Sequence, residues 1–548
     1  MKINISWMLS LSILCLGLTS CHDELNQEPY SSISPETFYK NEAEAGLALA
    51  AVYSDMGSAD LYGQLLSMKF TNGTDEALYS RTNVKWPTAL YMNNSSTVEV
   101  EKAWRRLYKG INSANHFLAR VVDADIEEVA KNKLLAESHF LRAFYYFDLV
   151  RLWGNVPLRT EPITEGSTAN DIGASHVSEV YDFIIDDLTF AYKHLPNPTG
   201  SPAEYGHASR TAAHALLARV YMTIAGKPSQ DQEVGAIYHI HEHDAYQLAI
   251  NHCDSVINTG YHQLLPSYKQ VFLNEIKDLN DDKEVIFEIQ FGNLRGEGLR
   301  EDGRIGNDNG VAIELPKLDA YGNANPYAYA FHYPSITMIN KFDAAQDNRY
   351  DWNIANWKVD KKGKVIVLPD TKKLNWYPGK FRRVDKVDNG DGTFGYVNLE
   401  TGDIDKNYTG INYPYLRYSD ILLMKAEALN ELSKTGEAIP FFNMVRNRAG
   451  LGNINEATVA SKEAFFNELM DERMREFCFE GIRKHDLIRW GRLQTNMEIL
   501  RTDMEVAGVT VDWAYRQCDN IEEKHNLLPI PLKEVTMNQL LEQSELWR

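Results

Sequence analysis

The sequence predicts a mostly α-helical protein, built from tetratricopeptide-like helix pairs that form a scaffold and interrupted by one large irregular insertion of loops and short strands. Apolar residues recur at helical spacing on both sides of this insertion, whereas the insertion is rich in Gly, Asn and Asp turns. With 548 residues, the chain can bury several helices against one another. We expect a single domain over residues 21–548, with the helical scaffold at about 30–273 and 413–548 and the insertion at about 274–412.

Residues 1–20 differ from the rest and predict an export signal. Lys2 precedes an almost uninterrupted apolar run that ends at Leu18, too short to span a membrane comfortably. The sequence "LTSC" at the end of this run resembles a bacterial lipobox, in which the cysteine is acylated after cleavage of the signal. Several acyl chains on one residue anchor a protein stably. We therefore predict a lipoprotein signal peptide and lipidation of Cys21; the alternative is a plain secretory signal with a chance cysteine.

The overall charge argues against negatively charged partners. The chain has 56 Lys and Arg against 76 Asp and Glu, a net charge of −20, and no basic block. Nucleic acid and anionic membrane surfaces would repel such a protein, so we predict no nucleic-acid partner. Asp23 and Glu24, close behind Cys21, resemble the surface-export signal of Bacteroidetes lipoproteins, and we expect the anchored protein to face the cell exterior.

The segment Glu137–Leu158, "ESHFLRAFYYFDLVRLWGNVPL", predicts a helix that is buried over much of its girth. Its apolar residues occupy two adjacent faces: Phe140, Phe144 and Phe147 on one, and Leu141, Tyr145 and Leu149 on the next. Gly154 and Pro157 end the helix. A helix that is apolar on so many sides must lie between other helices.

Repeated spacing identifies the neighbouring helices. Leu216–Gly226 is followed by Ala249–Asn258, and Leu422–Leu432 is followed by Ala438–Asn447; both second members have the pattern A-I-x5-V-x-N. Small residues on the first members allow close helix approach, as in tetratricopeptide-type pairs, although the full signature of that repeat is absent. Two further hairpins are expected, Val100–Arg120 with Asn132–Leu152 and Val177–His194 with Arg210–Ala225.

The insertion combines strand-like pieces with tight turns. Asp281–Phe291 has the β-rich composition of a strand, and Val365–Asp403 alternates such pieces with turn residues. Within it, "DNGDGTFGY" at Asp388–Tyr396 predicts a hairpin turn, because its acidic residues do not fall at the spacing of an EF-hand calcium loop. Loops on a rigid scaffold commonly carry binding residues, so we expect the ligand site to involve this region.

Motifs along the chain together resemble the SusD/RagB family of Bacteroidetes outer-membrane lipoproteins. Besides the lipobox, they are "LNQEPYSSISPETFYKNEAEAGLALAAVYSDM", "FLRAFYYFDLVRLWGNVPL", "PYLRYSDILLMKAEALNEL", "FNMVRNRAGL", "ERMREFCFEGIRKHDLIRWGRL" and "LLPIPLKEVTMNQLLEQ". The resemblance implies a helical scaffold with a glycan-binding surface made of loops. It also implies a partner, a SusC-like TonB-dependent transporter of the outer membrane, which the lipoprotein caps as a lid and supplies with oligosaccharide.

Two stretches contain the side chains that sugar recognition needs. Sugars present flat C–H faces ringed by hydroxyl groups, which suit aromatic planes flanked by amides, carboxylates or guanidinium groups. Asp75–Asn94 and Tyr321–Tyr333 combine these types. The candidate ligand-binding residues are Asp75, Arg81, Trp86, Tyr91, Asn93, Tyr327 and Tyr329. For each aromatic residue the alternative is local packing.

Trp86 is the foremost of these candidates. Pro87 biases it to extended backbone, and the surrounding residues lack an apolar period, so we expect an indole that is open to a sugar ring.

Other polar groups predict neither catalysis nor a metal site. The charges of "ERMREFCFEGIRKHDLIRW" recur at spacings of three and four, which suit ion pairs on a helix surface. Glu476 and Glu480 among them do not establish the carboxylate separation that glycoside hydrolysis needs. His239, His241 and His243 could hold zinc, but a solvated loop is the preferred interpretation. We predict no catalytic residue, no metal and no cofactor.

The expected function is therefore that of a non-enzymatic, glycan-binding outer-membrane lipoprotein. The alternatives are a binding protein for peptides or other nutrients and, from a different class, a glycoside hydrolase.

Overall fold

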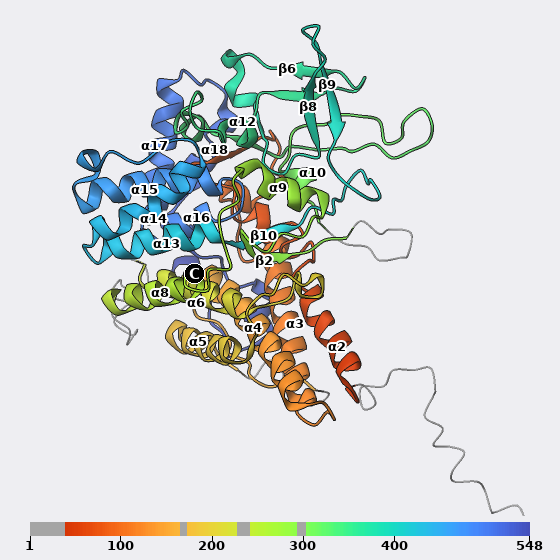
Figure 1. Ribbon diagram of the computed structural model, residues 1–548, viewed down its shortest axis with the longest axis vertical. Helices are drawn as coiled ribbons and strands as arrows, with labels where there is room; N and C mark the ends of the chain where they lie inside the picture. Colours follow the sequence, from red (N-terminus) through yellow and green to blue (C-terminus); the bar gives the residue numbers. More distant parts are fainter. Residues whose placement is uncertain (1–38, 165–171, 227–241, 293–302) are drawn as a thin grey trace, which may run out of the picture.

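The computed structural model describes residues 39–164, 172–226, 242–292 and 303–548, whose arrangement is shown in Figure 1. The fold is mostly α-helical, as predicted, and the strands within these ranges form only two-stranded sheets. The signal peptide, Cys21, His239 and His241 lie outside the described residues. Within the described ranges, every helix is too short or too polar to cross a lipid bilayer.

Consecutive helices pack pairwise into a continuous stack, which is the predicted scaffold. Its members are α2 (Glu42–Ser54), α3 (Val98–Val121), α4 (Glu128–Trp153), α5 (Val177–His194), α6 (Arg210–Ile224), α8 (Glu242–Ile257), α13 (Tyr418–Glu431) and α14 (Thr435–Arg448). Helix α3 packs on α4, α4 on α5, α5 on α6, and α6 on α8. Helix α13 packs on both α8 and α14, so the two parts of the scaffold meet across the insertion (Figure 1).

Helix α4 lies between other helices, as its aromatic sequence predicts. It lies against α2, α3 and α5, and Phe140, Phe144 and Phe147 are fully buried. The Glu127 side chain caps its first turn by accepting from two backbone amides, and Gly154, with a φ of 74°, follows its last residue. Helix α4 has more apolar residues than one amphipathic face needs because it packs against neighbours on several sides.

Gly110 allows α3 and α4 to approach closely, and its replacement is expected to destabilise the protein. A Cβ atom at this position would lie 2.6 Å from the Tyr145 ring. The ring is held because the Tyr145 hydroxyl donates to the Val52 carbonyl at 2.6 Å. We expect Gly110→Ala to lower the free energy of unfolding by about 1–3 kcal/mol, measured by urea denaturation. Gly46→Ala is the matched control: a Cβ there meets nothing within 4 Å, and alanine should stabilise helix α2 by about 0.5–1 kcal/mol. Equal urea midpoints for the two variants would contradict this account.

The insertion leaves and re-enters the scaffold through an antiparallel strand pair. Strand β2 (Val285–Ile289) pairs with β10 (Tyr413–Arg417), and Ile289 lies opposite Tyr413. The other pairs are β1 (Ala77–Tyr79) with β3 (His332–Pro334), β4 (Ile354–Ala355) with β7 (Tyr377–Pro378), β5 (Trp357–Val359) with β6 (Val365–Val367), and β8 (Val384–Asp388) with β9 (Phe394–Asn398). The β8–β9 hairpin confirms the turn predicted within Asp388–Tyr396.

Short helices complete the insertion and the carboxyl-terminal part. Helix α9 (Tyr268–Lys277) precedes β2, and the insertion contains α10 (Ile305–Asp308), α11 (Ile336–Asn340) and α12 (Tyr350–Asn353). After α14 come α15 (Lys462–Phe477), α16 (Arg483–Arg489), α17 (Leu493–Val506), α18 (Arg516–Asn520) and α19 (Leu532–Met537). Helix α17 packs on α11, so the last part of the chain returns to the insertion.

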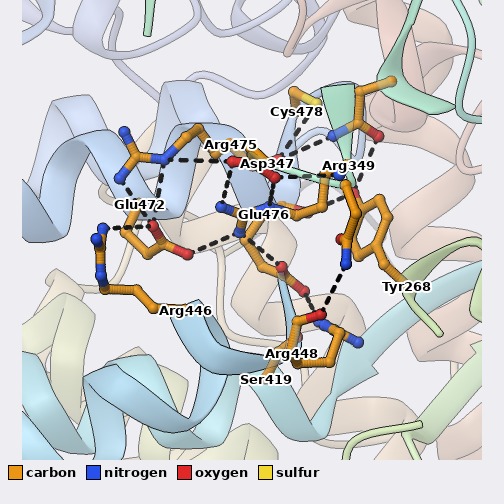
Figure 2. A network of polar contacts seen from close by, with 12 residues as sticks. Tyr268, Asp347, Arg349, Ser419, Arg446, Arg448, Glu472, Arg475, Glu476 and Cys478 are labelled. Atoms are coloured by element: carbon orange, nitrogen blue, oxygen red, sulfur yellow. Dashed lines mark hydrogen bonds and ion pairs between the residues drawn. The ribbon is translucent and has the colours of Figure 1, made fainter. Parts of the chain in front are cut away.

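A network of buried ion pairs joins the insertion to α15 (Figure 2). Arg349 donates to Glu472 at 2.7 Å and to Glu476 at 3.1 Å. Arg417 on β10 donates to Glu476 at 3.0 Å and to Glu480 at 2.8 Å. All five side chains are buried, so the expectation that the charges of this motif form ion pairs on a helix surface is wrong. Their partners come from distant segments, which spacing along one helix cannot reveal.

The network also determines the ionisation of Glu476. Burial by itself raises the pKa of this carboxyl group, but Arg448, Arg417 and Arg349 outweigh burial and hold the pKa well below its usual range. The Arg448 guanidinium lies 2.6 Å from the Glu476 carboxylate. A carboxylate enclosed in this way has no access to a substrate, and its contacts are those of a structural ion pair.

Candidate ligand-binding site

The structure brings the two stretches predicted to bind the ligand side by side. Strand β1 belongs to the first stretch and β3 to the second, and Leu78 lies opposite Tyr333 in their antiparallel pair. Beyond the strands, the Ser80 amide donates to the Phe331 carbonyl at 2.8 Å, and the Ser80 hydroxyl donates to the Ala330 carbonyl at 2.9 Å. The chain segments around Arg81 and Tyr329 are therefore held next to each other.

We define an aromatic patch by the residues that these segments and a neighbouring loop present at the surface: Arg81, Lys85, Tyr327, Tyr329, Lys406 and Asn407. The rings of Tyr327 and Tyr329 meet edge to face with centroids 4.8 Å apart. The Tyr329 hydroxyl donates to the Asn407 side chain at 3.2 Å, and the Lys406 ammonium lies 4.8 Å from the Tyr327 ring. Arg81 donates to the Tyr329 carbonyl. Two half-buried phenol rings are thus flanked by cations and an amide.

Buried polar side chains hold the patch from below. Asn307 on α10 donates to the Tyr327 carbonyl at 2.8 Å and to the Lys406 carbonyl at 2.7 Å. Arg383 donates to the Tyr327 carbonyl and to the Asp405 carbonyl, each at 2.8 Å. Because Asn307 and Arg383 are both buried, these bonds fix the two loops relative to each other. A binding surface organised in this way loses little freedom when a ligand binds.

Backbone strain is stored in the middle of the patch. Ala330, between Tyr329 and Phe331, has a φ of 49°, in the left-handed region that favours glycine. The conformation costs on the order of 1 kcal/mol and persists because the surrounding hydrogen bonds require it. It turns the chain between the half-buried Tyr329 and the buried Phe331.

The ionisation state of the patch suits hydroxyl-rich ligands. Burial raises the pKa of the Tyr327 hydroxyl, and the nearby Tyr329 and Glu314 raise it further. The phenol therefore remains protonated at neutral pH and can donate as well as accept hydrogen bonds. Together with the apolar faces of the rings, this provides both kinds of contact that a sugar offers.

Trp86 does not belong to this surface, contrary to the sequence expectation. Its side chain is 3% exposed and lies in a small apolar cluster with Tyr79, Ala89, Leu90 and Phe331. The Trp86 and Phe331 ring centroids are 4.2 Å apart. The expectation of an open indole is wrong because its partner Phe331 comes from the distant insertion, so the local sequence around Trp86 lacks the apolar period of a core segment.

Asp75, Tyr91 and Asn93 are also buried. Arg483 donates to both carboxylate oxygens of Asp75, at 2.9 and 2.7 Å, and Asn496 donates to one of them at 2.8 Å. The Tyr91 hydroxyl donates to a backbone carbonyl, and burial raises its pKa. Of the candidate residues, Arg81, Tyr327 and Tyr329 therefore lie in the patch, and the others lie beneath the surface.

Sequence reasoning missed Lys85, Lys406 and Asn407. Lys85 stands inside the first predicted stretch, but its ammonium group is not among the aromatic, amide, carboxylate and guanidinium groups expected to contact a sugar. Lys406 and Asn407 belong to "DKNYTG", residues 405–410, a turn-like sequence that places a cation, an amide and an aromatic together within the insertion. That combination is a signal that could have identified this loop.

His332, beneath the patch, predicts a loss of stability in acid. It is fully buried, and neither ring nitrogen has a hydrogen-bond partner among the described residues. Burial lowers its pKa to about 3. Between pH 6.5 and 3 the unfolded chain binds a proton that the native state excludes, so stability falls as pH falls. We expect His332 to account for about 2 kcal/mol of the stability lost between pH 7 and pH 5.

Urea denaturation at these two pH values tests this expectation, because His332→Phe should lose less stability between them than the wild type. His243→Gln, at an exposed histidine, is the control and should leave the difference unchanged. An identical pH dependence for His332→Phe and the wild type would contradict the assignment.

A concave region lies apart from the patch residues. A cavity of about 520 Å³ opens between α2 and β2, and its lining includes Tyr53, Arg106, Tyr205, His207 and Phe291. The Glu137 carboxylate accepts a hydrogen bond from His207 at 2.7 Å, which raises the pKa of the imidazole. The cavity shares no residue with the aromatic patch.

Comparisons with known proteins cover nearly the whole chain. Residues 283–547 match the model of the SusD family, and residues 25–222 match a family described as starch-binding and associating with the outer membrane. SusD-like protein P25 of Formosa agariphila is 29% identical over 97% of this chain and 97% of its own length. The starch-binding protein SusD of Bacteroides thetaiotaomicron is 22% identical over 98% of this chain and 97% of its own. The crystal structure of a SusD homolog from the latter organism has a TM-score of 0.82 at 26% identity, covering 93% of this chain and 98% of that one.

Proposed function

Because this chain belongs to the SusD/RagB family, we propose that it is a non-enzymatic protein that captures glycans through the aromatic patch. The observation that carries the proposal is the pair of half-buried rings, Tyr327 and Tyr329, flanked by Arg81, Lys406 and Asn407 and held by buried hydrogen bonds. The name of the starch-binding relative and the starch-binding description of the matching family support a glycan as the ligand.

The decisive experiment is calorimetric titration against a panel of oligosaccharides. For any glycan that binds the wild type, Tyr329→Ala should lower the affinity about tenfold or more, because the ring loses apolar contact worth roughly 1.5–2 kcal/mol. Tyr321→Ala is the matched control, since this tyrosine of the same stretch is 91% exposed and makes no ring contact with the patch. Its affinity should equal that of the wild type.

Other outcomes of the titration lead to different conclusions. If both Tyr327→Ala and Tyr329→Ala bound the glycan as tightly as the wild type, the patch would not be the binding site. The cavity between α2 and β2 would then be the next candidate. Turnover of an oligosaccharide would favour a glycoside hydrolase. Saturable binding of peptides, with no glycan bound, would favour the capture of another nutrient.

The protein would act at the outer membrane as the lid of a SusC-like TonB-dependent transporter. The family description of association with the outer membrane supports this setting. Cys21 would carry the lipid anchor, with the protein facing the cell exterior and delivering its glycan to the transporter. Extraction in mild detergent should co-purify a large transporter with the wild-type protein. In a strain lacking that transporter, Cys21→Ala should move to the soluble fraction, and a variant that stayed membrane-bound there would exclude the lipid anchor.

A further inference from the structure

We propose that the aromatic patch selects acidic glycans, which carry carboxylate or sulfate groups, over neutral ones. The proposal rests on the proposed function and names the chemical class of its ligand. It follows from an unusual local charge: in a protein with a net charge of −20, the patch and its border bring together Arg81, Lys85, Lys406 and Arg516.

These cations are near one another in space. The Arg81 guanidinium and the Lys85 ammonium lie 4.8 and 5.3 Å from the centroid of the same Phe331 ring. Arg516 on α18 donates to the backbone carbonyls of Arg81 and Thr82. Lys406 reaches the other end of the patch over Tyr327, whose ring contacts Tyr329. A ligand that lies across Tyr327 and Tyr329 would therefore meet positive charge at both ends.

The charges are available to a ligand because no carboxylate of the described residues lies within ion-pair distance of any of the four. Elsewhere the protein neutralises such groups: Lys69 pairs with Glu99 at 3.0 Å, and Arg304 pairs with Asp308 at 2.9 Å. The rings under Lys85 and Lys406 attract each ammonium group but leave its protons free to donate.

Three carboxylates that neighbour the patch, those of Glu314, Asp308 and Asp405, are engaged with other groups. Glu314 acts on Tyr327 electrostatically, but its carboxylate is paired with Lys358 at 2.7 Å. Asp308 is held by Arg304, and Asp405 accepts from the backbone amides of Asn407 and Tyr408. Glu314 and Asp308 are each paired with a cation, so the Asp405 carboxylate alone of the three stands against the four cations, and the local charge is positive. Positive charge attracts anionic ligands and leaves the binding of neutral sugars unchanged, so it increases the affinity for acidic ligands alone.

The test compares each acidic oligosaccharide with its own neutral counterpart by calorimetric titration. The probes are galacturonate oligomers with their carboxyl-reduced form, and sulfated galactan oligosaccharides with their desulfated form, which separate carboxylate from sulfate recognition. We expect at least one acidic member to bind about tenfold more tightly than its counterpart at 0.1 M salt. The preference should shrink at 1 M salt, where the screening length falls from about 10 to about 3 Å.

Variants that each remove one positive charge show which residues cause the preference for acidic glycans. Lys85→Gln and Lys406→Gln should each weaken binding of the acidic probe about fivefold to tenfold and leave any neutral glycan unaffected. Lys434→Gln is the matched control, because Lys434 is an exposed lysine in the turn between α13 and α14, well away from α10 in Figure 1. Equal losses in all three variants would indicate non-specific attraction and overturn the proposal.

The titrations distinguish a wrong ligand class from a wrong function. If neutral glycans bind at the patch as tightly as acidic ones, the ligand class is wrong and glycan capture stands. If neither acidic nor neutral members of a broad oligosaccharide panel bind, both are overturned.

Discussion

Arg417→Met is expected to lower the free energy of unfolding by about 3–5 kcal/mol, because it removes one of the cations that neutralise three buried carboxylates. The Arg417 side chain is 1% exposed and donates to Glu284, Glu476 and Glu480 at distances between 2.8 and 3.0 Å. Methionine fills similar volume, so lost packing contributes little. Chemical denaturation of the purified protein, with the unfolding midpoint as the readout, measures the effect.

A surface ion pair provides the control for this experiment. Arg501 pairs with Asp519 where the two side chains are 37% and 51% exposed. Water screens such a pair, and Arg501→Met should change stability by no more than about 0.5–1 kcal/mol. If the two variants had similar unfolding midpoints, the network in Figure 2 would contribute no more than an exposed ion pair.

Trp86→Ala is the second substitution with a large expected effect. The indole is 3% exposed and packs on Phe331 and Tyr79 at centroid distances of 4.2 and 5.7 Å. Removal of a buried aromatic side chain leaves a cavity and costs about 3–5 kcal/mol. A thermal melt should show a clear fall in the melting temperature. Any loss of glycan affinity in this variant would follow from movement of Phe331 beneath the patch.

Tyr321→Ala serves again as the control, because it removes an aromatic ring that is 91% exposed from the same pair of stretches. Its melting temperature should match that of the wild type. An unchanged melt for Trp86→Ala would mean that the indole is exposed in solution and would restore it as a candidate sugar platform.

The helical scaffold could be predicted in detail because helix periodicity is local information. The apolar faces of Phe140 to Leu149 and the repeated anchor spacing in α8 and α14 lie within single helices, so they predicted both the helices and their pairing. The hairpin at Asp388–Tyr396 followed from turn residues that stand next to one another in sequence. Each of these features depends on residues of a single helix or turn.

The candidate site could be predicted only in part. Composition indicated the two aromatic stretches, and Arg81, Tyr327 and Tyr329 do lie in the patch that they form. Composition did not distinguish a ring at the surface from a ring in the core: Trp86 lies inside the apolar cluster that contains Phe331, whereas Tyr329 only borders this cluster. Lys406 enters the patch from a third segment, held by Asn307.

By itself, the sequence determined the helices and their pairing, since backbone periodicity and turn chemistry are encoded in neighbouring residues. The tertiary structure alone decided which charged and aromatic side chains are buried. Glu476 is ionised in the interior because Arg349, Arg417 and Arg448 converge on it from separate segments. The positive patch arises in the same way, because β1 pairs with β3 and places Arg81 beside Tyr329. Burial and electrostatic environment depend on residues that only the folded chain brings together, and no local pattern records them.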